Sequence, residues 1–146
     1  MTMTPHALKR FLDAQDEMYF KALAEVTNGK KVTHWMWFIF PQLKGLGFSE
    51  TAKFYGITAL DEAAAYLSNP VLGTNLVAIS EVLLKINGKS ATAIFGTSDD
   101  LKLRSCMTLF SKVPNADPVF SNVLDQYFMG ITDARTIQIL EKNVAK

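Results

Sequence analysis

The run His34-Trp-Met-Trp-Phe-Ile-Phe-Pro-Gln42 contains both tryptophans of the chain in an otherwise unbroken apolar segment. Thr33 precedes it as a candidate N-cap, so a helix here would place His34 in its first turn. Such a helix is apolar on every side and is therefore expected to be buried on every side. A buried strand is the alternative, because periodicity does not separate the two in so short a run. In either form the run predicts the centre of the core, with a pocket beside it as the functional possibility.

Amphipathic helices are predicted on both sides of this run. Before it, residues 5–27 carry apolar side chains at helical spacing, and Gly29 follows at the position of a C-terminal glycine. After it, caps and stop signals predict a series of helices. They run from Ser49 to Phe54, from a capping box at Thr58-Ala-Leu-Asp61 to Pro70, from Val71 to Ile86, from Ser90 to Gly96, from Ser98 to about Ser111, from Asp117-Pro118 to Gly130, and onward from Asp133.

No alternating strand pattern, internal repeat or linker interrupts these helices. We therefore expect one compact all-α domain over residues 1–146, with about seven or eight helices around the buried Trp-rich run. A chain of this length buries roughly 70% of its unfolded surface, so it needs no disulfide or metal to hold the fold. Residues 1–4 are expected to fray.

The composition gives no sign of a polyanionic partner or a metal. Lysine and arginine number 15 against 14 acidic residues, and no basic tract is long enough to predict nucleic-acid binding. Cys106 is the only cysteine, which excludes an intrachain disulfide and cysteine-rich zinc patterns. The only histidine besides His34 is His6, so neither a metal nor another cofactor is expected.

The cellular location follows from what the sequence lacks. The longest apolar run is far shorter than the roughly 20 residues of a membrane span. The first residues do not show the charged segment and apolar stretch of a secretory signal. We therefore expect a cytoplasmic protein without a membrane partner, and we favour a monomer.

Gln15 is a polar residue in an apolar place. Steps of about 100° per residue put it at the centre of the apolar face of the helix over residues 5–27. A buried amide left unpaired costs about 1–3 kcal/mol, so it must find partners. One interpretation is a bond to a neighbouring backbone carbonyl, and the other is an amide that orients a ligand at a pocket floor. Asn75, within the apolar face of residues 71–86, repeats the argument in weaker form.

His34, Trp37 and Gln42 are the candidates in the Trp-rich run. The positive end of a helix would keep the His34 ring neutral, which suits binding or proton transfer and makes it the one candidate catalytic residue. The alternative is a histidine that caps local backbone. Trp35 and Trp37 cannot share a side of a helix, so one belongs to the core and Trp37 is the candidate stacking surface. Gln42 would add a neutral polar group.

Lys102 and Arg104 lie on the helix predicted from Ser98 to Ser111. Lys102 is at the margin of its apolar side, where the lysine stem could simply cover apolar surface. Otherwise the two cations near a helix start would form an anion or phosphate clamp. Cys106 lies on the apolar side and is expected to be inert packing.

Several segments resemble a bacterial family catalogued as domain of unknown function 1810. They are the nine-residue Trp-rich string, Gly45-Leu-Gly47 with Ser49, Glu62-Ala63 with Tyr66-Leu67, Leu72-Gly73, Phe95-Gly96, and the run from Asp100 to Phe110. The resemblance extends from Phe11 to Leu140 and implies a small, mostly helical, cytoplasmic protein without an established reaction. Some members carry a calpastatin label, which does not suit a chain without repeats or a disordered composition. A looser likeness, in size and helix content, is to small helical proteins that act on ADP-ribose-like and N-glycosidic compounds.

Two functions are compatible with these residues. The first is binding of a phosphate- or ribose-bearing metabolite, such as a nucleotide or an ADP-ribose-like compound, with catalysis left open. Its pocket would lie between residues 5–27, the Trp-rich run and the helix from Ser98. The residues expected to line it are Gln15, His34, Trp37, Gln42, Lys102 and Arg104. The second is a non-catalytic helical interaction module whose polar core groups only fix helix register.

Overall fold

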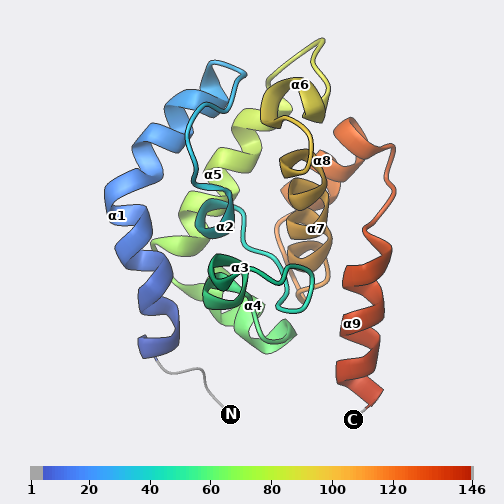
Figure 1. Ribbon diagram of the computed structural model, residues 1–146. Helices are drawn as coiled ribbons and strands as arrows, with labels where there is room; N and C mark the ends of the chain where they lie inside the picture. The colour runs from blue at the N-terminus through green and yellow to red at the C-terminus, as the bar shows by residue number, and fades with distance from the viewer. Residues whose placement is uncertain (1–4, 146) are drawn as a thin grey trace.

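The computed structural model describes residues 5–145, which form nine helices and no strand (Figure 1). The helices are α1 (Pro5–Thr27), α2 (Met36–Ile39), α3 (Glu50–Tyr55), α4 (Leu60–Ser68), α5 (Leu72–Leu84), α6 (Ala91–Phe95), α7 (Asp99–Ser111), α8 (Val119–Phe128) and α9 (Ala134–Ala145). The predicted all-α class is confirmed. The fraying expected at residues 1–4 lies outside the described residues.

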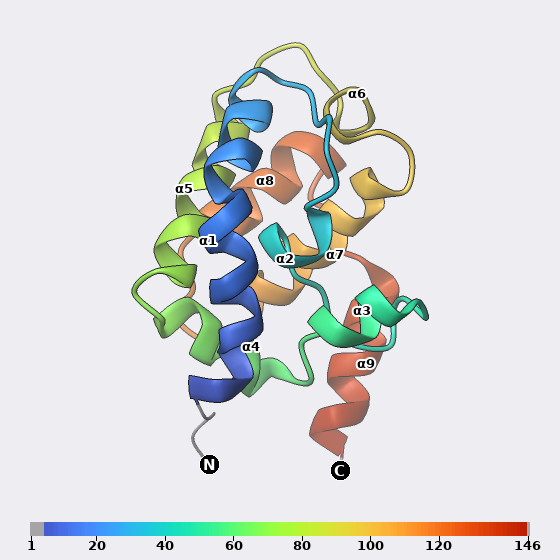
Figure 2. The ribbon, with the colours of Figure 1, turned by 60° about the vertical axis from the view of Figure 1, so that its left-hand side comes forward.

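The longer helices pack side by side in an order that differs from their order in the chain. α5 contacts α1 on one side and α8 on the other, and α7 lies between α8 and α9. α1 and α9 therefore form opposite flanks of the molecule, while the short α2 and α3 cross the middle between them (Figures 1 and 2). α2 contacts both α1 and α3. This arrangement brings the Trp-rich run close to α7 and to the start of α9.

A row of aromatic rings joins four helices through the core. Phe11 of α1 meets Tyr66 of α4 at a centroid distance of 5.1 Å. Tyr66 meets Phe110 of α7 at 5.3 Å, and Phe110 meets Phe120 of α8 at 5.8 Å. Such tilted and edge-on pairs add about 0.5–1.5 kcal/mol each beyond the area they bury. All four rings are fully buried, so this row is the centre of the core.

The Trp-rich run is helical over one turn only, which corrects the prediction of a longer buried helix. Trp35 occupies the N-cap position, and its side chain makes no capping bond. The main-chain N–H of Thr33 donates to Glu25 instead of starting a helix. Pro41 limits the other end, because the residue before a proline avoids helical backbone, and Phe40 accordingly has φ −122° and ψ 74°.

The burial of the run differs from the prediction in the same way. Trp35 and Phe40 are buried as predicted, whereas Trp37 and Phe38 are half-buried. His34 lies before the helix and is exposed, so its predicted first-turn position, and the reason given for a neutral ring, are wrong.

The predicted helix caps are right in some places and wrong in others. The Oγ of Ser49 accepts from the Ala52 N–H, and that of Ser90 accepts from the Ala93 N–H, as expected. Ser98 instead has φ +81° and makes no side-chain cap. The N-cap of α4 is Ala59, so the predicted capping box does not form.

The join between α4 and α5 depends on a glycine. A Cβ added at Gly73 would overlap the carbonyl oxygen of Leu67, which belongs to α4. Glycine therefore allows the backbones of the two helices to approach here. No single helix of the described residues is long and apolar enough to cross a membrane, and α4 with α5 passes that test only as a pair bent by 89°.

Candidate functional site

Two adjoining hollows share Trp37 and Lys102 as lining residues. We call the first the Gln42 hollow; it measures about 270 Å³ and is lined by Trp37, Gln42, Leu46, Gly47, Leu101, Lys102, Ser105, Asp133 and Arg135. We call the second the His34 hollow; it measures about 400 Å³ and is lined by Lys31, His34, Trp35, Met36, Trp37, Phe38, Thr51, Asp99 and Lys102. His34, Trp37, Gln42 and Lys102 of the predicted set thus lie around one cleft.

Lys102 is held in place between the two hollows. Its Nζ lies 4.7 Å from the centroid of the Trp37 ring and donates to Asp99 Oδ1 at 2.9 Å. A cation over an indole face is attracted by about 0.5–1 kcal/mol at an exposed site and more when desolvated. Lys102 therefore does more than cover apolar surface with its stem, because its ammonium group lies against the Trp37 ring at the wall of the cleft.

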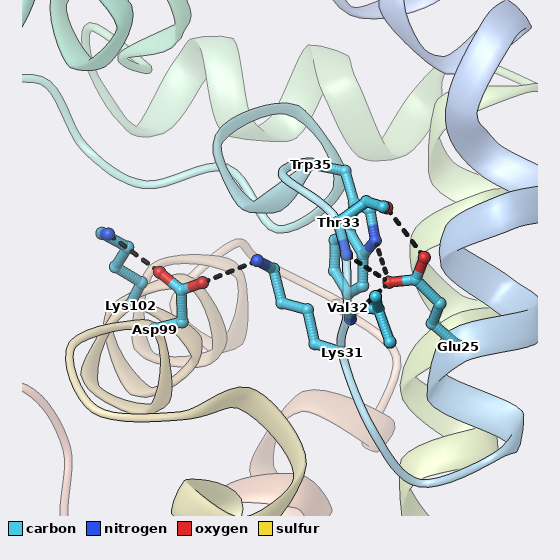
Figure 3. A network of polar contacts seen from close by, with 7 residues as sticks. All are labelled: Glu25, Lys31, Val32, Thr33, Trp35, Asp99 and Lys102. Carbon is cyan, nitrogen blue, oxygen red and sulfur yellow. Dashed lines mark hydrogen bonds and ion pairs between the residues drawn. The ribbon is translucent and has the colours of Figure 1, made fainter.

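Asp99 connects Lys102 to a second lysine (Figure 3). Asp99 Oδ2 lies 2.8 Å from the Nζ of Lys31, whose side chain is only 8% exposed and lies over the Trp35 ring. Burial opposes ionisation of Asp99, but hydrogen bonds and charge from Lys31 and Lys102 outweigh it and lower its pKa. Asp99 is therefore held ionised between the two lysines that line the His34 hollow with it.

Glu25 of α1 holds the segment that carries these groups (Figure 3). Its Oε1 accepts from the N–H groups of Val32 and Thr33, at 2.7 and 3.0 Å, and from Trp35 Nε1 at 2.9 Å. Its Oε2 accepts from the Thr33 hydroxyl at 2.7 Å. Partial burial raises the pKa of Glu25, and these hydrogen bonds lower it to a net value of about 2. Sequence reasoning missed this residue, because nothing in the spacing of α1 distinguishes Glu25 from its exposed neighbours.

Gln42 supplies the one polar group of the cleft that is both buried and unpaired among the described residues that line it. The residue is 5% exposed, and its Nε2 has no hydrogen-bond partner there. The backbone at this point is fixed, since the Gln42 carbonyl accepts from the Ile57 N–H and the Lys44 N–H donates to the Ile57 carbonyl, both at 2.8 Å. A buried unpaired amide costs about 1–3 kcal/mol, so a ligand acceptor at Nε2 would remove a standing penalty.

Arg104 does not join Lys102 in this cleft. Residues two apart on a helix point about 200° apart, so the predicted clamp of these two cations does not form. Arg104 lines neither hollow, and its Nη2 lies 3.8 Å from Asp133 Oδ1. The second cation of the Gln42 hollow is Arg135, exposed on the first turn of α9, whose Nη2 lies 3.5 Å from the Gly45 carbonyl. Sequence reasoning had no signal for Arg135 beyond its charge.

Gln15 is also separate from the cleft. It is 4% exposed, and its Nε2 donates to the Phe38 carbonyl and to the Tyr66 hydroxyl, both at 2.8 Å. Its Oε1 accepts from Asn75 Nδ2 at 3.0 Å. The hollow that it lines, of about 460 Å³, lies between α1 and the start of α5. The bond to the Phe38 carbonyl agrees with the structural interpretation of Gln15. The Tyr66 hydroxyl and the Asn75 amide are two further partners, both side chains.

The largest hollow described, of about 770 Å³, contains none of the predicted residues. It lies between α4, α5, the loop before α8 and α8 itself. Its polar lining side chains, such as Glu81 and Asp117, are exposed, and its interior is apolar. It has the volume of a ligand pocket without convergent buried polar groups, so we place the candidate site at Trp37 and Lys102. No group of three or more metal-ligating side chains occurs among the described residues.

Comparisons with known proteins agree with the resemblance seen in the Trp-rich run. The profile of a family described as "Protein of unknown function (DUF1810)" matches residues 5–140. The chain is similar to the solved structure of the conserved hypothetical protein Rv1873 from Mycobacterium tuberculosis, with 44% sequence identity and a TM-score of 0.92 over 94% of this chain and 99% of that chain. Comparison with curated proteins gave no match. The chain belongs to the DUF1810 family of proteins of unknown function.

Proposed function

We propose that this protein binds a small phosphate-bearing metabolite in the cleft at Trp37 and Lys102. The observation that carries the proposal is the buried, unpaired Nε2 of Gln42 in a hollow that also contains two cationic side chains. A native protein retains few such groups, and each calls for an explanation. An anion that accepts a hydrogen bond from Gln42 Nε2 supplies that explanation.

The charges of the cleft suit a phosphate group. Lys102 and Arg135 line the Gln42 hollow together with the Gln42 amide. Hydrogen bonds from cations to phosphate are about twice as strong as those between neutral groups, and arginine matches phosphate with two parallel bonds. Trp37 forms the wall between this hollow and the His34 hollow, so the remainder of the ligand could extend along its ring toward His34. His34 remains the candidate for proton transfer.

The second candidate function is an interaction module without a ligand. The observation in its favour is the Gln15 group, whose bonds to Phe38, Tyr66 and Asn75 are all internal to the protein. Such fully paired polar groups can serve only to fix the register of helices. The two functions differ in whether the Gln42 hollow binds a ligand, because an interaction module requires no ligand there.

A thermal-shift titration with nucleotides and sugar phosphates tests the proposal. A ligand at 100 times its dissociation constant stabilises the native state by about 2.7 kcal/mol. Lys102→Met should reduce the affinity of a binding compound by about tenfold or more, since a hydrogen bond to a charged group is lost. Lys112→Met, at the exposed C-cap of the same helix, is the matched control and should leave the affinity unchanged. No shift with any phosphate compound, or equal shifts in both variants, would contradict the proposal.

A further inference from the structure

The Gln42 hollow contains a carboxylate beside its cations. Asp133, whose side chain is 16% exposed, lines the hollow together with Lys102 and Arg135. A carboxylate repels a phosphate, so a site built for a bare anion gains nothing from it. A ligand group that donates a hydrogen bond would suit it better than a phosphate oxygen.

The two oxygens of Asp133 have different surroundings. Oδ2 accepts from the N–H and the hydroxyl of Thr136, at 2.9 and 2.6 Å, and so caps the start of α9. Oδ1 accepts no hydrogen bond from the described residues, and Arg104 Nη2, at 3.8 Å, is beyond hydrogen-bonding length. One oxygen therefore serves the fold, and the other has its acceptor capacity free.

The hollow offers a second acceptor. The hydroxyl of the buried Ser105 donates to the Leu101 carbonyl at 3.2 Å, which leaves lone pairs of its oxygen available. Gln42, Lys102 and Arg135 are donors, whereas Asp133 Oδ1 and Ser105 Oγ are acceptors. A bare phosphate would use the donors only, but a ligand that carries both phosphate and hydroxyl groups would use both kinds.

On the basis of the proposed function, we infer that Asp133 accepts a hydrogen bond from a hydroxyl group of the ligand. The ligand is then a phosphorylated polyol of the sugar-phosphate class. The phosphate would lie among Gln42, Lys102 and Arg135, and a hydroxyl next to it would donate to Asp133 Oδ1. The hollow measures about 270 Å³, just below the usual range of ligand pockets, and so suits a small ligand or one part of a larger ligand. Asp133 is thus a specificity-determining residue rather than part of the anion clamp.

Three probes separate this inference from the proposed function. Calorimetric titrations would compare ribose 5-phosphate, n-pentyl phosphate, which has the same carbon count without hydroxyls, and inorganic phosphate. Ribose 5-phosphate should bind at least about tenfold more tightly than pentyl phosphate, because an alkyl chain gives Asp133 Oδ1 no hydrogen-bond donor. Equal binding of the two overturns the inference and leaves the proposed function standing. Absence of binding by all three overturns both.

Asp133→Asn tests the residue itself. Asparagine caps helices as well as aspartate does, so α9 keeps its cap while an amide donor replaces the free acceptor. The affinity for ribose 5-phosphate should fall about tenfold or more, and that for pentyl phosphate should stay equal or rise, since a repelling charge is gone. Asp117→Asn is the control, because Asp117 Oδ1 accepts from the Val119 N–H at the start of α8, outside the cleft. A parallel loss for both ligands in Asp133→Asn, or no change for either, would overturn the role of Asp133.

Discussion

Gln15 and Gln42 are two buried amides with opposite hydrogen-bond status. Gln15→Leu leaves the Phe38 carbonyl, the Tyr66 hydroxyl and the Asn75 amide without their partner. We expect it to destabilise the fold by about 1–3 kcal/mol. Gln42→Leu removes an amide nitrogen that has no partner among the described residues, so stability should be unchanged or higher while ligand binding is lost. Urea midpoints of the two variants decide this; equal destabilisation would show that Gln42 is structural.

The site could be predicted in part at this scale. Gln15 and Gln42 stand out in the sequence because they are polar within apolar surroundings, and the structure buries both. The roles of Glu25, Asp133 and Arg135 could not be predicted from the sequence. Glu25 bonds the segment before α2, and Asp133 and Arg135 line a hollow together with residues of α7 and of the Trp-rich run. Such pairings depend on how the helices pack, and helix periodicity carries no information about that.

Among the elements, the segment before α2 depends on pH through Glu25. The pKa of this carboxyl is about 2 in the folded protein and near its ordinary value of 4.5 in the unfolded chain, so folding favours the ionised form. The resulting stability is present above about pH 4.5 and is lost as the pH falls toward 2. We expect Glu25→Gln to be less stable at pH 7 and to lose less stability over that pH range than the unmodified protein. Thermal melts from pH 2 to 7 measure this, with Glu17→Gln on the exposed side of α1 as control.

The close approach of α4 and α5 gives a second prediction at this scale. Gly73→Ala would push a methyl group into the Leu67 carbonyl, and overpacking of this kind costs about 1–3 kcal/mol. Gly88→Ala is the comparison, because its added Cβ meets nothing within 4 Å and only its positive φ is unfavourable. Denaturant unfolding should show the larger loss for Gly73→Ala. The reverse order would mean that relief of the overlap at Leu67 costs less than a positive φ at an alanine.

Most helix boundaries were predictable because glycines, prolines and capping serines act locally. The bounds of α1, α3 and α6 match the predicted ones within a residue or two. The Trp-rich run was not predictable in this way, because a carboxylate from α1 and a following proline override its apolar pattern. Its conformation is decided by a tertiary contact at one end and by Pro41 at the other, rather than by the helical pattern of its apolar residues.

For the whole molecule, Cys106 reports opening of the core. Its side chain is fully buried in α7, and burial raises the pKa of its thiol well above the usual value. Thiol reagents should therefore react slowly with the native protein, at a rate set by unfolding, and a bound ligand should slow them further. A disulfide-exchange assay at increasing urea concentration measures this. Rapid labelling of the native protein would show that α7 detaches locally.

The different positions of Trp35 and Trp37 allow the two residues to serve as separate fluorescence probes of the protein. The Trp35 indole is fully enclosed and donates to Glu25, whereas Trp37 is half-buried on the wall of the cleft. The fluorescence of Trp35 therefore reports whether the segment before α2 is in place. The fluorescence of Trp37 reports what lies beside Lys102. Acrylamide should quench Trp37 first, so an occupant of the cleft would be visible as protection of one fluorophore while the other stays constant as an internal reference.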